Sequence, residues 1–203
     1  MRSMLKKSAA LLAAMLLDGE ARGPIGLGQK SFGKLREPLV RLVQWGRSFG
    51  IASAQGSWKI GDPSDVGTRL GQSPLRAPSV FNFFRLGYVP PSSASSATQT
   101  PAPEFQLVNE SNVSGYLNYM QVVMRSGIYV NGAEKLQSGV GAVDGYDITA
   151  ACTAEFALVL DALASVNHLN LVLCEGQLSV ATRTLIAAAV LLVMACPEYL
   201  IQK

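Results

Sequence analysis

The sequence has few charged residues and almost no histidine. Charged residues make up 15% of its 203 residues, against about 25% in an ordinary soluble domain. A poorly charged surface suggests that a partner, or a neighbouring segment of a longer chain, covers part of it. With His168 as the one histidine, a zinc site is not expected, and Ser-His or Cys-His catalysis has weak support.

Cysteine is also scarce. The three cysteines are Cys152, Cys174 and Cys196, and no two of them have the C-x-x-C spacing of metal or redox motifs. An odd number leaves at least one thiol unpaired. Cys174 and Cys196 lie in apolar runs, which favours buried small hydrophobic residues over reactive thiols. The redox compartment stays open.

Motifs of common catalytic and cofactor sites are missing. There is no G-x-S-x-G nucleophile elbow and no H-E-x-x-H zinc motif. The stretch GPIGLGQKS, residues 23–31, lacks the lysine that must follow the second glycine of a P-loop. Asp144 and Asp147 in VDGYD lack the spacing of a calcium loop, so a turn is the better interpretation. We expect no metal and no other cofactor, while enzymatic activity stays open.

No run is long enough to cross a membrane. The apolar run LIAAAVLLVMAC, residues 185–196, has twelve residues, fewer than the roughly 20 that a membrane-spanning helix needs. It predicts a helix buried on all sides, and the other helices barely suffice to cover it.

Basic charge is concentrated in the first half. Residues 1–100 carry thirteen Lys/Arg and five Asp/Glu, whereas residues 101–203 carry four Lys/Arg and nine Asp/Glu. Because the basic residues are scattered and form no stripe, we do not expect nucleic-acid binding. The two halves are more simply read as complementary parts of one fold.

The periodic segments predict a mainly α fold of about four to five helices within a single domain over residues 1–203. Apolar residues recur at helical spacing in four segments, which are 35–49, 112–126, 153–174 and 180–196. The N-terminus has the pattern of a signal peptide, in which basic residues precede an apolar run. The basic residues are Arg2, Lys6 and Lys7, and the apolar run covers residues 8–17. A helix ending at Gly23-Pro24 is the favoured alternative, because Asp18-Gly19-Glu20 makes a poor cleavage site.

A long segment rich in proline and aromatic residues interrupts the helices between about residues 53 and 110. The low-complexity part, residues 92–101, predicts a flexible loop. Glycines in 131–147 predict a second loop.

The aromatic part of this segment, SPLRAPSVFNFF followed by GYVPP, allows two interpretations. In the first, which the sequence favours, its rings plug the core; these are Phe81, Phe83, Phe84 and Tyr88. In the second, they form a site for an anionic or sugar-like ligand, bound through cations, an amide and ring contacts. The candidate ligand-binding residues are Arg76, Asn82, Arg85 and Tyr88.

The same stretch resembles a signature of the uncharacterised bacterial family DUF 1800. Further segments resemble successive parts of that family in the same order; they are MLLDGEARG, GKLREPLVRLVQW, APEFQLVNESNVSGYLNYM, LNLVLCEGQLSVATRTLI and VLLVMACPEYLIQK. Two departures stand out. Leu86 occupies a position where relatives commonly have proline, and TLI runs almost directly into the last apolar segment.

The resemblance implies a chain from the C-terminal portion of a longer, largely helical protein, and hence a truncated member. It also implies a periplasmic or secreted location for full-length members, and no agreed catalytic residues. The leading hypothesis is a non-catalytic helical module for partner binding or scaffolding in an exported bacterial protein. Its partner would be the missing N-terminal portion, another exported protein or a second copy. The alternative is a remnant or domain of an enzyme acting on a polymer or anionic ester, with catalytic groups in the missing portion.

Overall fold

The computed structural model describes residues 2–19, 23, 33, 35–131 and 144–194. It divides into two compact units, Met1–Leu35 and Arg36–Lys203. That residues 1–203 form a single domain therefore stays a prediction. The glycine-rich stretch 24–31 and Cys196 lie outside the described residues.

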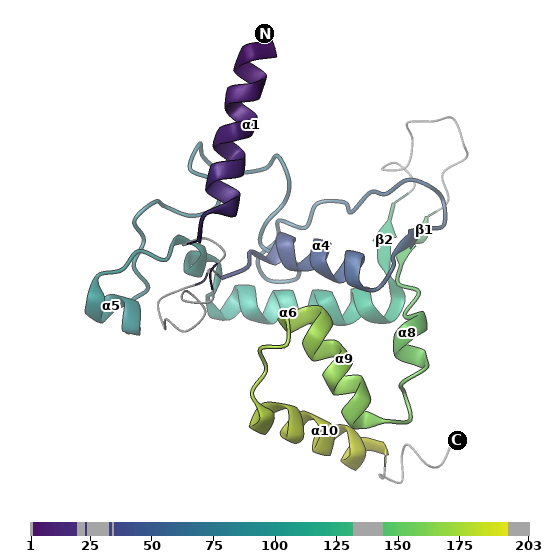
Figure 1. Cartoon of the computed structure of the whole chain (residues 1–203). Helices are drawn as coiled ribbons and strands as arrows, with labels where there is room; N and C mark the ends of the chain where they lie inside the picture. The colour runs from purple at the N-terminus through teal and green to yellow at the C-terminus, as the bar shows by residue number, and fades with distance from the viewer. Residues whose placement is uncertain (1, 20–22, 24–32, 34, 132–143, 195–203) are drawn as a thin grey trace. The chain divides into compact units, whose positions relative to one another are not determined.

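The first unit contains one described helix, α1 (Arg2–Leu17), drawn in purple in Figure 1. The expected helix is therefore present. It ends at Leu17, earlier than the expected end at Gly23-Pro24. Asp18, which has low helix propensity, interrupts the helix at this point. None of the helices that the structure describes is both long and apolar enough to span a bilayer.

The second unit is mainly helical, as predicted. Its helices in chain order are α4 (Pro38–Ser48), α5 (Ala94–Thr98), the 3-10 helix η1 (Pro103–Leu107), α6 (Glu110–Ser126), α8 (Thr153–Phe156), α9 (Ala162–Cys174) and α10 (Val180–Met194). Helix α5 lies inside the segment expected to be a loop. Its N-cap is Ser93, whose hydroxyl accepts a hydrogen bond from the Ser96 amide at 3.2 Å.

Local sequence signals explain where α4, α6 and α10 begin and where α6 ends. Pro38 occupies the first turn of α4, where its missing amide proton costs nothing. Asn109 caps α6 by accepting from the Asn112 amide at 2.9 Å, and Ser179 likewise accepts from the Thr182 amide at 3.0 Å. Gly127 ends α6 with a φ of 91°. These caps confirm the helices expected over 35–49 and 112–126 and the start of the last one.

The single helix expected over 153–174 is wrong. The chain forms two helices, α8 and α9, separated by residues 157–161. Asp161 starts the second helix, because its carboxylate accepts from the Ala164 amide at 2.9 Å. The Ser165 hydroxyl also donates to the Leu158 carbonyl at 2.7 Å and holds the break in place.

Helix α9 ends against helix α4. The Arg36 guanidinium donates to the Leu173 carbonyl at 3.0 Å and to Gln44 Oε1 at 2.8 Å, and it forms an ion pair with Glu175. A cation at the carbonyl end of a helix complements the helix dipole. Residues far apart in the sequence therefore join these two helices.

The last helix is less buried than expected. Helix α10 packs against α9, as Figure 1 shows, and Ala187 is buried. Leu185, however, is 72% exposed and Val180 is 70% exposed. The prediction that this helix is buried on all sides is therefore wrong for its described part.

A small antiparallel sheet was not expected. Its strands β1 (Ala52–Ser53), β2 (Ile128–Val130) and β3 (Gly145–Thr149) lie in the order β1-β3-β2, with Ile148 of the central strand opposite both Ser53 and Ile128. Residues 145–147 therefore form a strand, and the loop and turn expected there are wrong. Asp147 is fully buried in it.

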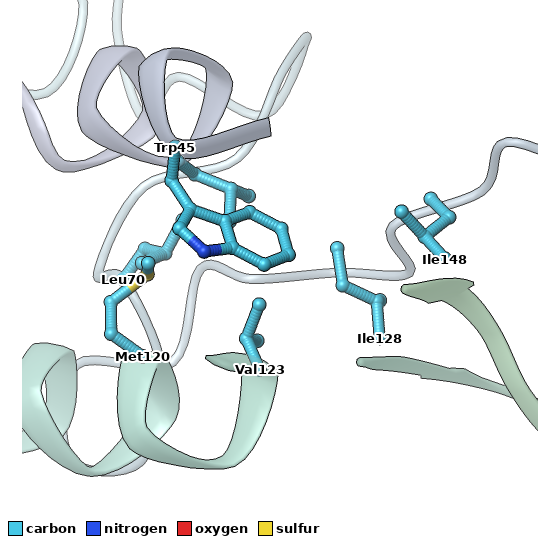
Figure 2. Packing of buried hydrophobic residues seen from close by; sticks show 7 residues of the cluster. Trp45, Leu70, Met120, Val123, Ile128 and Ile148 are labelled. Carbon is cyan, nitrogen blue, oxygen red and sulfur yellow. The ribbon is translucent and has the colours of Figure 1, made fainter. Parts of the chain in front are cut away.

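The core lies where α4, α6 and the sheet meet. Figure 2 shows the Trp45 indole next to Val123, with Leu70 and Met120 to one side and Ile128 and Ile148 to the other. The buried cluster consists of Leu42, Trp45, Leu70, Met120, Val123, Ile128 and Ile148. All seven are at most 7% exposed.

The phenylalanines do not plug this core, although the sequence favoured that interpretation. Phe81 is 58% exposed and Val80 is 94% exposed, while Phe83, Phe84 and Tyr88 are half-buried. A tight turn keeps this part at the surface: the Asn82 amide donates to the Ser79 carbonyl at 3.2 Å, and Asn82 has a φ of 68°. Leu70, which precedes the aromatic segment, enters the core instead.

Candidate functional site

The four residues selected from the sequence do not converge on one site. Asn82 and Arg85 line a hollow of about 360 Å³ that also involves Gln106, whose Oε1 accepts from the Arg85 amide at 2.7 Å. Arg76 lines a different hollow of about 480 Å³. Tyr88 lines neither of these two hollows.

A third cavity has a volume of about 380 Å³, and we call it the tyrosine pocket. Its walls carry Tyr119 from α6, Tyr129 from β2 and Tyr146 from β3. Val122, Val123 and Ile128 supply apolar surface, and Thr68, Arg69 and Asn118 supply polar groups. Ligand sites typically combine apolar and aromatic walls with a few polar groups in this way.

Strand pairing positions two of the tyrosines. Tyr129 and Tyr146 are direct partners across β2 and β3, and their rings meet edge to face at 5.4 Å between centroids and 84° between planes. Such a pair contributes about 0.5–1.5 kcal/mol beyond its buried area. Both side chains are about half exposed, at 50% and 47%. The sheet therefore presents an aromatic surface that is exposed beside the pocket.

Tyr119 brings an unsatisfied polar group to the pocket. Its hydroxyl is buried and has no hydrogen-bond partner among the described residues, a situation that costs about 1–3 kcal/mol. Burial raises the pKa of Tyr119, and the positive charge of Arg69 partly opposes that shift. A polar atom of a ligand would relieve this cost.

The hollow that contains Arg76 is built around Trp58, and we call it the tryptophan hollow. It also contains Lys59, Ile60, Asp62 and Pro74. The Trp58 side chain is 57% exposed and its φ is +54°. A left-handed backbone costs a residue other than glycine about 1–2 kcal/mol, so surrounding structure must hold Trp58 in place.

Asp147 provides that support from the sheet. Its buried carboxylate accepts hydrogen bonds from the Ser53 hydroxyl at 2.6 Å, the Gln55 amide at 2.7 Å and the Ser57 hydroxyl. The Trp58 amide in turn donates to the Ser53 hydroxyl at 3.3 Å. The turn that presents Trp58 is therefore fastened to β3.

Asp62 connects the tryptophan hollow with the tyrosine pocket. Its carbonyl accepts from the Arg69 guanidinium at 3.0 Å, and its carboxylate pairs with Arg76 at 3.1 Å. Ile60 lines both cavities. Hydrogen bonding from Ser64 mainly lowers the pKa of Asp62, and the charge of Arg76 adds to the effect. Asp62 is therefore an anion placed between two arginines.

A further polar pair lies between α8 and the middle of α9, and neither of its residues lines these cavities. His168 Nε2 lies 2.7 Å from Glu155 Oε1 and joins α8 to α9. Burial raises the pKa of the nearby Cys152 thiol, and the charge of Glu155 raises it further. Because the thiolate is the nucleophile, this environment disfavours a reactive Cys152. Within the described part of the chain, no three His, Cys, Asp or Glu side chains are placed to hold a metal ion.

Sequence reasoning missed Trp58 and the three tyrosines. The pocket tyrosines lie in separate segments, and no short motif joins them. In the structure Ile128 and Val130 are buried and Tyr129 between them is exposed, but three residues are too few for this alternation to be recognised in the sequence.

Comparison with known proteins assigns the chain to a family, but that family has no described activity. A search of curated proteins and a search of solved structures each found no match to the chain. Residues 6–201 match a family model described as "Protein of unknown function (DUF1800)". Because the match spans nearly the whole chain, this chain belongs to the DUF1800 family.

Proposed function

We propose that this chain is a non-catalytic partner-binding module, and that its tyrosine pocket receives an extended segment of a partner polypeptide. The observation that carries the proposal is the half-exposed tyrosine pair at the mouth of a cavity with apolar walls. Tyrosine and arginine are enriched at protein interfaces, where a flat ring offers a large contact area at low entropic cost.

The arrangement of polar groups supports a peptide ligand. Asn118, Thr68 and Arg69 supply donors and acceptors around the apolar walls. A peptide needs both, since its backbone requires hydrogen bonds and its side chains require apolar contacts. The buried Tyr119 hydroxyl adds a polar group inside the cavity.

The exposed apolar residues on α9 and α10 are consistent with a module that works in an assembly. Leu163 and Leu171 on α9 are 55% and 67% exposed, and Leu185 on α10 is 72% exposed. Exposed apolar side chains on two helices that pack together are candidates for contact with a partner. The location of the assembly, exported or otherwise, stays a prediction.

Replacing Tyr129 by alanine is expected to weaken peptide binding while the chain stays folded. The measurement is selection of random twelve-residue peptides displayed on phage by the immobilised chain, followed by titration of the best peptide. Loss of one aromatic wall should weaken binding by about tenfold or more, the effect of an interface hot spot.

Val113→Ala is the matched control, because Val113 is exposed on α6 and does not line the tyrosine pocket. It should bind the same peptide as the native chain. Failure of the native chain to select any peptide, or equal affinity in the Tyr129→Ala variant, would rule out the proposed function.

A second candidate function is a domain of an enzyme that acts on a polymer or an anionic ester. The hollow shared by Asn82, Arg85 and Gln106 favours it, because an arginine beside amide side chains suits an anion. This candidate expects hydrolysis of p-nitrophenyl phosphate that Arg85→Ala abolishes at an unchanged unfolding midpoint. Absence of hydrolysis by the native chain would count against it.

A further inference from the structure

The tryptophan hollow lies next to the tyrosine pocket and is not explained by a ligand confined to that pocket. The two cavities share Ile60, and Asp62 bonds to an arginine at each of them, Arg69 through its carbonyl and Arg76 through its carboxylate. A ligand that leaves the tyrosine pocket along residues 60–62 therefore meets Trp58 and Arg76.

Trp58 is held ready for contact before any ligand arrives. Its left-handed backbone is fixed through Ser53 and Ser57 by the fully buried carboxylate of Asp147. A large side chain that is constrained at its backbone and still 57% exposed gains contact area without losing much freedom on binding. Strained, over-determined residues of this kind are concentrated at ligand-binding sites.

The charges around Trp58 select for an anion. Lys59 and Arg76 line the hollow, and Arg69 lies beside it, whereas Asp62 is the one acidic residue among the side chains lining the two cavities. The Arg76–Asp62 pair is exposed, at 64% and 40% of the two side chains. Exposed ion pairs are weak, so a carboxylate from a ligand can replace Asp62 as the partner of Arg76.

We propose that the partner segment is acidic and occupies both cavities. One apolar side chain enters the tyrosine pocket, an Asp or Glu pairs with Arg76 and Lys59, and a neighbouring proline or aromatic ring stacks on Trp58. This inference rests on the proposed function and adds the chemistry of the partner. An extended peptide suits the arrangement because its successive side chains reach separate cavities along one line.

The test compares the peptides that different variants select from the same random library. Peptides selected by the native chain should be enriched in Asp and Glu, and binding should weaken as salt rises. The Arg76→Gln variant should lose the acidic enrichment, keep the apolar residue, and bind the native-selected peptide about tenfold more weakly, as expected for one lost charge-assisted contact. Arg85→Gln is the matched control, because Arg85 lines a different hollow, and it should keep the enrichment.

Tryptophan fluorescence gives an independent readout. The chain has two tryptophans, of which Trp45 is 5% exposed and Trp58 is 57% exposed, so acrylamide quenching reports mainly on Trp58. A selected acidic peptide should protect the native chain from quenching and leave a Trp58→Phe variant unchanged.

The outcomes separate this inference from the function on which it rests. Selection of peptides without acidic enrichment, or acidic peptides that leave Trp58 quenchable, overturns the inference while the proposed function stands. If the native chain selects no peptide, both are overturned. Protection of Trp58 by an anionic polysaccharide such as heparin, without protection by any peptide, also overturns the peptide assignment.

Discussion

Replacing Asp147 by alanine should lower the free energy of unfolding by about 3–5 kcal/mol, the largest effect that we expect from a single polar residue. The substitution removes the acceptor of three hydrogen bonds, from Ser53, Gln55 and Ser57. Removing one partner of a buried charged interaction typically costs about 3–5 kcal/mol, because the donors left behind lose their acceptor while the cost of burying the carboxylate disappears with it. Urea unfolding followed by circular dichroism measures the change.

Glu110→Ala is the control for Asp147→Ala. Glu110 has the same charge and is exposed in the first turn of α6, so its replacement should change stability by no more than about 1 kcal/mol. Equal unfolding midpoints for the two variants would show that the buried carboxylate does not stabilise the fold. Acrylamide quenching of Trp58 should also change in Asp147→Ala, because the turn that holds it loses its attachment.

Replacing Gly127 by alanine should destabilise the protein by about 3 kcal/mol. Gly127 joins α6 to β2 with a φ of 91°, and an added Cβ would lie 2.4 Å from the Ile148 carbonyl oxygen. The backbone conformation accounts for about 1–2 kcal/mol. Overlap with an atom of the central strand, which cannot rotate away, adds about 1–3 kcal/mol.

Gly50→Ala separates these two contributions. Gly50 also has a positive φ, at 58°, but no atom lies within 4 Å of its added Cβ. Its replacement should therefore cost only the conformational part, about 1 kcal/mol. Thermal unfolding of both variants measures the difference, and equal losses would contradict a close contact between Gly127 and the central strand.

The helices were the predictable part of the fold because their signals are local. Asn109, Ser179 and Pro38 each mark a helix start within one turn of the chain. The break at Asp161 was missed because the apolar period continues through it, and only the capping carboxylate shows that a new helix begins. At such a point the apolar period favours one continuous helix, whereas the side-chain hydrogen bond of the capping residue favours a new start, and the structure has the new start.

The sheet and the tyrosine pocket were unpredictable for one common reason. β1 has two residues and β2 has three, too few for a recognisable alternation, and their pairing depends on β3 far along the chain. For the aromatic segment the sequence predicted burial that the structure does not show. Phe81 and its neighbours looked like core residues by composition, but the turn at Ser79 and Asn82 keeps Phe81 at the surface.

The central position of β3 has a consequence for synthesis on the ribosome. Ser53 pairs with Ile148, which is translated 95 residues later. At about 5–20 residues per second, the ribosome needs roughly 5–20 s to add these residues. During this time Asp147 is not yet available to fasten the turn at Trp58, and the Trp45 side of α4 has no sheet to cover it. The nascent chain is therefore expected to expose this apolar surface for seconds before its core can close.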